Sequence, residues 1–134
     1  MKLDSLFDMF KNTNCAAALL TETWIKSGGN FDRIYDEITN SHGLGMIAYN
    51  RPGRRRGGGV AIVFNKSKIS LEEHKFHRNG IEMVAVKGRI IGQKRTVVLM
   101  SVYLPPNLLT SRVKHANELI NNEIDHIKTL FDSP

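Results

Sequence analysis

The pattern of apolar and polar positions divides the chain into a short helix, a series of strands and a long C-terminal helix. Apolar residues recur at helical spacing between Leu3 and Phe10, and polar residues 11–14 end this pattern. Residues 15–20 are continuously small or apolar, which is typical of a strand buried on both faces. Further strands are predicted at 44–49, 60–64, 69–76, 81–91 and 95–103, and a brief helical turn at 31–39.

The C-terminal part of the chain has the clearest helical periodicity. Its apolar residues step by three and four positions: Val113, Ala116, Ile120, Ile124, Ile127 and Phe131. This spacing predicts a helix that packs on a sheet. Before it, Gly92-Gln93-Lys94 predicts a hairpin turn, and Pro105 and Pro106 end the second strand of that hairpin because proline cannot donate to a ladder.

Length and composition are those of one basic globular unit. The chain has 134 residues, 41% of them hydrophobic, which suffices for one core. Nineteen Lys and Arg against 13 Asp and Glu leave a net charge of +6, which favours a polyanionic partner. The alternative is a basic protein without such a partner. The single cysteine excludes an intrachain disulfide, and no apolar run approaches membrane length. We expect no membrane anchor, no secretion signal and an intracellular location.

Two polar side chains at strand ends are the candidates for chemistry. Glu22 follows the strand at 15–20, and Tyr103 ends the strand at 95–103. Phosphodiester hydrolysis requires a hard cation and positioned donors, and one or two carboxylates suffice to hold Mg²⁺. Glu22 is therefore a candidate magnesium ligand. The structural alternatives are that Glu22 caps or solvates a strand end and that Tyr103 is a half-buried packing residue.

Three motifs together resemble the first half of an endonuclease/exonuclease/phosphatase domain, of the kind that non-LTR retrotransposons carry beside a reverse transcriptase. They are Glu22-Thr23-Trp24, Arg56-Gly57-Gly58-Gly59-Val60 and Val102-Tyr103-Leu104-Pro105. The resemblance implies that Glu22 is the catalytic metal ligand and that the Tyr103 hydroxyl positions the scissile phosphate. Several nucleases of this family have asparagine where this chain has Pro106, so Asn107 is the nearest candidate phosphate ligand.

The basic loop before the strand at 60–64 is a candidate DNA contact. Arg54, Arg55 and Arg56 are expected to bind backbone phosphates, and a solvated basic loop is the alternative. The glycines at 57–59 lead into a strand rather than a helix and lack the Lys-Ser/Thr of a nucleotide-binding loop. We therefore interpret them as a tight entry into a buried strand.

The resemblance also implies an α+β fold of the α/β/β/α sandwich type, of which residues 1–134 form a part. The first strand of that fold and its C-terminal half, with the motifs Gly-Asp-Phe-Asn and Ser-Asp-His, do not occur in this sequence. We expect one mainly antiparallel mixed sheet with helices on one face. The other face of this sheet is expected to be uncovered and to promote self-association.

The functional hypothesis is a fragment of a magnesium-dependent DNA endonuclease that is inactive as it stands, because most members of the catalytic constellation are absent. Its expected partners are DNA and the remainder of a retrotransposon polyprotein, and an intact element would act in the nucleus. Two alternatives remain open: a fragment of a phosphatase from the same superfamily, and a noncatalytic basic module that binds nucleic acid by charge.

Overall fold

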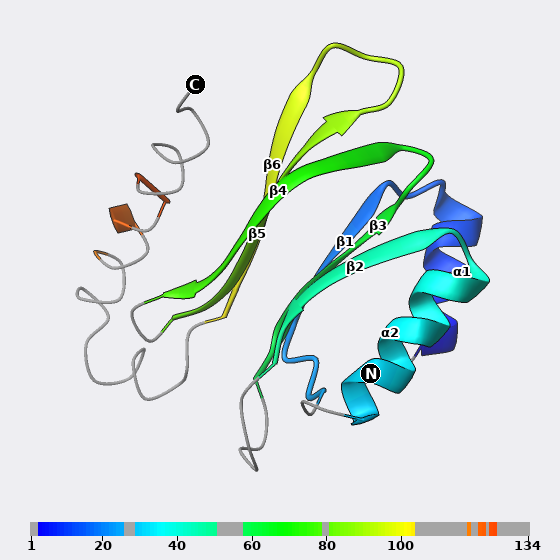
Figure 1. Ribbon diagram of the computed structural model, residues 1–134, viewed down its shortest axis with the longest axis horizontal. Helices are drawn as coiled ribbons and strands as arrows, with labels where there is room; N and C mark the ends of the chain where they lie inside the picture. The colour runs from blue at the N-terminus through cyan, green and yellow to red at the C-terminus, as the bar shows by residue number, and fades with distance from the viewer. Residues whose placement is uncertain are drawn as a thin grey trace.

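The computed structural model describes residues 3–25, 29–50, 58–78, 81–103, 118, 121–122 and 124–125. Figure 1 shows their arrangement: two sheets face each other, and two helices lie on the outer side of one of them. The elements are α1 (Leu3–Thr13), β1 (Ala17–Thr21), α2 (Gly29–Ser41), β2 (Leu44–Tyr49), β3 (Val60–Asn65), β4 (Ile69–Arg78), β5 (Ile81–Ile90) and β6 (Thr96–Tyr103).

Both sheets are antiparallel and have three strands, in the orders β1-β3-β2 and β4-β5-β6. The α+β fold class is confirmed, but the strands divide between two sheets where one was expected. The division occurs at a tight turn after β3, in which the Asn65 side chain accepts hydrogen bonds from Ser67 N at 2.9 Å and Ser67 Oγ at 2.6 Å. This turn sends the chain into the second layer instead of back along the first sheet.

The two helices cover the outer face of the first sheet. Leu6 and Phe10 of α1 and Ile34 and Ile38 of α2 form one apolar core with residues of β1, β2 and β3. The segment expected to be a brief helical turn is thus a helix of 13 residues. Ile34 and Ile38 lie four positions apart on one face of α2 and are buried against the sheet. This burial stabilises the helix, although most of its sequence is polar.

A second core lies between the two sheets. Val60 and Ile62 of β3 and Val84 of β5 are fully buried there, while the alternate β3 residues Ala61 and Val63 belong to the helix-facing core. β3 is therefore buried on both faces, as its continuous apolar sequence predicts. The inner face of the first sheet, which the sequence interpretation left uncovered, is covered by the second sheet.

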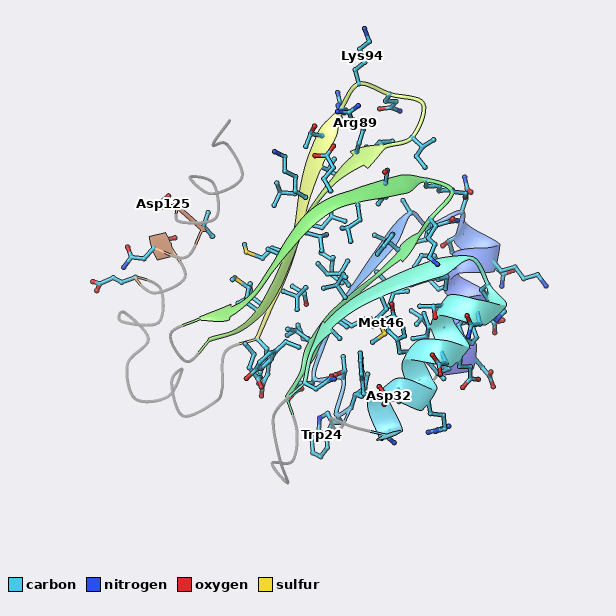
Figure 2. All side chains as sticks on the ribbon, viewed as in Figure 1. Trp24, Asp32, Met46, Arg89, Lys94 and Asp125 are labelled. Atoms are coloured by element: carbon cyan, nitrogen blue, oxygen red, sulfur yellow. The ribbon has the colours of Figure 1, made fainter. Side chains whose placement is uncertain are left out.

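The outward face of β5 is buried in the first half of the strand and exposed at Arg89. Met83 is 1% exposed and Ala85 0%. Asp125 lies on this side of the second sheet in Figure 2. Of the expected C-terminal helix, the structure describes five residues, all helical: Glu118, Asn121, Asn122, Ile124 and Asp125. None of the helices in the described ranges is both long enough and apolar enough to cross a membrane.

Candidate active site

Glu22 lies immediately after β1, in a backbone segment that is held against the start of β3. Thr21 pairs with Val60, and beyond this pair Thr23 N donates to Gly59 O at 3.3 Å and Trp24 N to Gly58 O at 3.0 Å. The turn that these bonds hold projects the Glu22 side chain into solvent while the Thr23 side chain is buried at 5% exposure. Figure 2 shows Trp24 at this end of the first sheet.

The backbone of this turn has an unusual conformation. Glu22 and Trp24 have φ angles of 51° and 56°, on either side of Thr23. L-residues rarely adopt positive φ because the side chain approaches the backbone, and such residues cluster at functional sites. The hydrogen bonds to Gly58 and Gly59 hold this conformation, so the position of the Glu22 carboxylate depends on the glycine pair.

Gly58 and Gly59 fit this role because neither has a side chain. Their φ angles are 65° and 86°, and both residues are buried. A Cβ atom on Gly59 would lie 2.5 Å from Thr23 Oγ1. The expectation that the glycines form a tight entry into a buried strand is confirmed for these two residues. Thr23 Oγ1 is itself buried and has no hydrogen-bond partner in the described part of the chain.

Tyr103 is the last residue of β6 and reaches the same end of the molecule. It is half-buried and pairs with Glu82 at the start of β5. The Glu82 side chain is 4% exposed and accepts a hydrogen bond of 3.5 Å from Gly59 N, across the two sheets. Gly59 is the residue whose carbonyl accepts from Thr23 N. A continuous series of backbone and side-chain contacts therefore links the Glu22 turn to Tyr103.

A second contact between the sheets supports the same alignment. Ser101 Oγ donates to Leu20 O at 2.7 Å. Ser101 precedes Tyr103 by two residues and Leu20 precedes Glu22 by two, so the final residues of β1 and β6 run side by side. Glu22, directly after β1, and Tyr103, the last residue of β6, consequently lie at the same end of two neighbouring strands. Their catalytic roles stay predictions.

Glu82 is the residue that the sequence interpretation missed. The signal was present, because Glu82 is the only acidic residue in the apolar run 81–91. A carboxylate in such a run costs free energy unless it is hydrogen-bonded, so its presence there points to a structural or functional role. In the structure this role is to accept from the Gly59 amide beneath the Glu22 turn.

The described residues at this end of the sandwich supply only some of the ligands of a divalent-cation site. Glu22 offers one exposed carboxylate, and Mg²⁺ is often held by one or two carboxylates with water and substrate phosphate completing the octahedron. The described residues contain no group of three or more His, Cys, Asp or Glu side chains able to share an ion. The candidate DNA ligands Arg54, Arg55, Arg56 and Asn107 lie outside the described residues.

Comparisons with known proteins support the fold. No family model and no curated protein matches the sequence. The structure is similar to the crystal structure of truncated Caenorhabditis elegans TDP2, with a TM-score of 0.58 and 17% sequence identity. The likeness covers 96% of this chain and 49% of the TDP2 chain, so this chain spans about half the length of that structure. TDP2 has the endonuclease/exonuclease/phosphatase fold, and at this identity the likeness shows the fold alone.

Proposed function

We propose that this chain is part of a magnesium-dependent, phosphodiester-cleaving endonuclease domain of the retrotransposon type, and that the chain by itself is inactive. The observation that carries the proposal is the alignment of Glu22 and Tyr103 on neighbouring strand ends through Gly59, Glu82 and the Ser101–Leu20 contact. A carboxylate and a phenol placed in this way can serve one phosphate. The fold shared with TDP2 agrees with phosphodiester chemistry.

Each residue has a defined role in the proposed site. The Glu22 carboxylate would hold Mg²⁺, which when bound supplies positive charge to the phosphate oxygens. The Tyr103 hydroxyl would donate a hydrogen bond to a nonbridging oxygen and orient the phosphorus for in-line attack. Thr23, Gly58 and Gly59 hold the Glu22 backbone, and Trp24, 60% exposed beside it, offers an aromatic surface for a nucleobase. DNA is accordingly the proposed partner.

The metal site is tested by a Glu22→Gln variant. Trp24 is the only tryptophan and lies two residues from Glu22, so Mn²⁺ used in place of Mg²⁺ should quench its fluorescence saturably. We expect Glu22→Gln to weaken this binding by about tenfold or more, since even residues that only support a metal ligand contribute that much.

Glu37→Gln is the matched control for this experiment. Glu37 is exposed on α2 and undergoes the same change of charge away from the strand ends. We expect its quenching curve to match that of the wild type. Equal Mn²⁺ affinity in Glu22→Gln and the wild type would remove Glu22 from the metal site.

Inactivity is tested on supercoiled plasmid. With Mg²⁺ present, we expect no nicking above a buffer control, because the loss of single members of a cooperating catalytic group already removes most of the rate and the sequence lacks several. A Mg²⁺-dependent nick that disappears in Glu22→Ala would contradict the inactivity and would leave the site assignment in place.

A noncatalytic basic module is the second candidate, and the net charge of +6 favours it. Binding by charge alone releases counterions, so the DNA affinity would fall steeply with salt. Under this alternative, neither Glu22→Ala nor Mg²⁺ changes the affinity. Under the proposed site, Mg²⁺ strengthens DNA binding by the wild type and has a smaller effect on Glu22→Ala.

A further inference from the structure

The β3–β4 turn and the β5–β6 turn lie side by side at the end of the sandwich opposite the Glu22 turn. Ile91 N donates to Lys68 O at 2.9 Å, which joins the two turns directly. Figure 2 shows Lys94 at this end of the molecule and Trp24 at the other. β5 is ten residues long and spans about 30 Å from one end to the other, so the two ends are well separated.

Positive charge is concentrated in these two turns. Residues 65–71 and 88–96, which we call the basic end, contain no acidic residue and five basic ones: Lys66, Lys68, Arg89, Lys94 and Arg95. In contrast, α1 and α2 together contain five acidic residues and two basic ones. Charges separated in this way produce a positive potential at one end of the molecule, whereas evenly mixed charges would cancel.

The charge of the basic end is available to a partner. Three of its five cationic side chains are exposed and form no ion pair with another described residue: Lys66, Lys94 and Arg95. Lys68 Nζ donates to Asn14 O at 2.7 Å, and this neutral acceptor leaves the lysine charge in place. Arg89 has an ion pair with Glu72 at 3.6 Å, but both side chains are exposed and such pairs are weak.

Backbone hydrogen bonds hold the two turns in a fixed arrangement. Ile90 N donates to Arg95 O and Gln93 N to Ile90 O, both at 3.1 Å, so the β5–β6 turn is closed at its base. In the other turn, Lys66 N donates to Gly43 O at 3.1 Å. A preformed surface loses little entropy on binding. Figure 1 shows the β5–β6 turn projecting at the upper end of the molecule, and a projection two strands wide fits the major groove of B-DNA.

We propose that the basic end is a second DNA-binding surface, which contacts the phosphate backbone of double-stranded DNA without metal and without sequence preference. Ammonium and guanidinium groups bind phosphate oxygens and release counterions from the duplex. The surface is compatible with either candidate function, because it requires neither Glu22 nor Mg²⁺. It also lies beyond the strand ends, and therefore leaves the edges of β1 and β6 free for the rest of a larger domain.

The composition of the basic end favours nucleic acid over an anionic membrane. Ile91, 51% exposed, is the one large apolar side chain exposed in these two turns. Peripheral membrane binding requires a broader apolar face that enters the lipid. Ser70, Gln93 and Thr96 are also exposed at the basic end, and side chains of these types donate hydrogen bonds to phosphate oxygens in protein–DNA complexes.

Fluorescence anisotropy of a labelled DNA duplex, measured in EDTA, tests the proposal on the full chain. The logarithm of the wild-type association constant should fall linearly with the logarithm of the NaCl concentration. We expect Arg95→Gln to reduce the magnitude of this slope by about 0.9, the value for one phosphate contact, and to weaken binding about eightfold in about 0.1 M NaCl. Arg33→Gln is the matched control, because Arg33 is exposed on α2 and loses the same charge.

Two further measurements separate contact with DNA from a general effect of the substitution. Arg95→Lys keeps the charge and should retain the wild-type salt slope. In a Cys15→Ser background, Gln93→Cys labelled with benzophenone should crosslink to the duplex on illumination, because Gln93 is exposed in the β5–β6 turn. Tyr35→Cys with the same label should not, because Tyr35 is 39% exposed on α2, away from the basic end.

Several results would overturn the proposal: no duplex binding by the wild type in EDTA, the same salt slope in Arg95→Gln and Arg33→Gln, or equal crosslinking from Gln93→Cys and Tyr35→Cys. Binding to phosphatidylserine vesicles without binding to duplex DNA would also overturn it. The Glu22 site is tested separately, because Mg²⁺ should strengthen DNA binding by the same factor in Arg95→Gln and in the wild type. Failure of the Glu22 site would abolish this increment and leave the result in EDTA unchanged.

Discussion

Replacing Gly59 by alanine is expected to destabilise the protein by about 3 kcal/mol. The φ angle of 86° costs an L-residue about 1–2 kcal/mol, and the new Cβ would lie 2.5 Å from the buried Thr23 Oγ1, an overlap that typically costs a further 1–3 kcal/mol. Thr23 has little room to move away, because Thr23 N is bonded to Gly59 O. Urea unfolding followed by Trp24 fluorescence measures the loss.

Gly92→Ala provides the matched control for this prediction. Gly92 has the same φ angle of 86°, but a Cβ atom there would meet nothing within 4 Å. It should therefore show the conformational cost alone, about 1–2 kcal/mol. If both variants lost the same stability, the close approach between Gly59 and Thr23 would not exist in solution. Gly59→Ala should also weaken Mn²⁺ quenching of Trp24, since the Glu22 turn rests on this glycine.

Truncation of Ile62 to alanine is the second change with a large expected effect. Ile62 is 0% exposed and packs in the inter-sheet core with Val84 and Val86. Removing its outer atoms leaves a cavity that β3 cannot fill, because this strand is fixed by ladders on both sides, and such truncations cost about 2–5 kcal/mol. The midpoint of urea unfolding, measured at one protein concentration, should fall accordingly.

The same truncation at Ile91 is the control. Ile91 is 51% exposed in the turn after β5, so Ile91→Ala should change the free energy of unfolding by about 0.5 kcal/mol or less. An Ile62→Ala variant as stable as Ile91→Ala would show that the two sheets do not pack through this residue. Far-UV circular dichroism of both folded variants should match the wild type.

Most of the local structure could be predicted from the sequence, because it depends on short-range patterns. The helical spacing of α1 and the β-branched runs of β3, β5 and β6 each place their element within a few residues of where the structure has it. The extent of α2 was missed because its sequence is mostly polar, and two buried isoleucines, Ile34 and Ile38, stabilise it only through contact with the sheet.

The partition of the strands into two sheets could not be predicted, because a run such as Val60–Asn65 shows that two faces are buried but not which strands lie beside it. The turn at Asn65 and Ser67 decides the partition, and its side-chain hydrogen bonds have no periodic signature. Pairing in a sheet is a long-range property, whereas periodicity is local.

The site residues at the strand ends were predicted from the sequence, whereas the buried Glu82 was missed. Glu22 and Tyr103 were found because motifs place them at strand ends, and the structure sets those ends side by side. Glu82 was missed because its function depends on contact with Gly59, a residue distant in the sequence. The positive φ angles of Glu22 and Trp24 were also missed, because neither residue is a glycine or an asparagine, the types that most often adopt positive φ.

The chain passes between the two sheets only once within the described ranges, at the turn after Asn65, so each sheet is one uninterrupted stretch of sequence. During synthesis, the helices and the first sheet can assemble while the second sheet is still inside the ribosome. Val60 and Ile62 then face solvent until Val84 and Val86 emerge, on the order of seconds at usual elongation rates. During this interval the nascent chain presents a bare apolar sheet, which makes it a substrate for chaperones that bind hydrophobic segments.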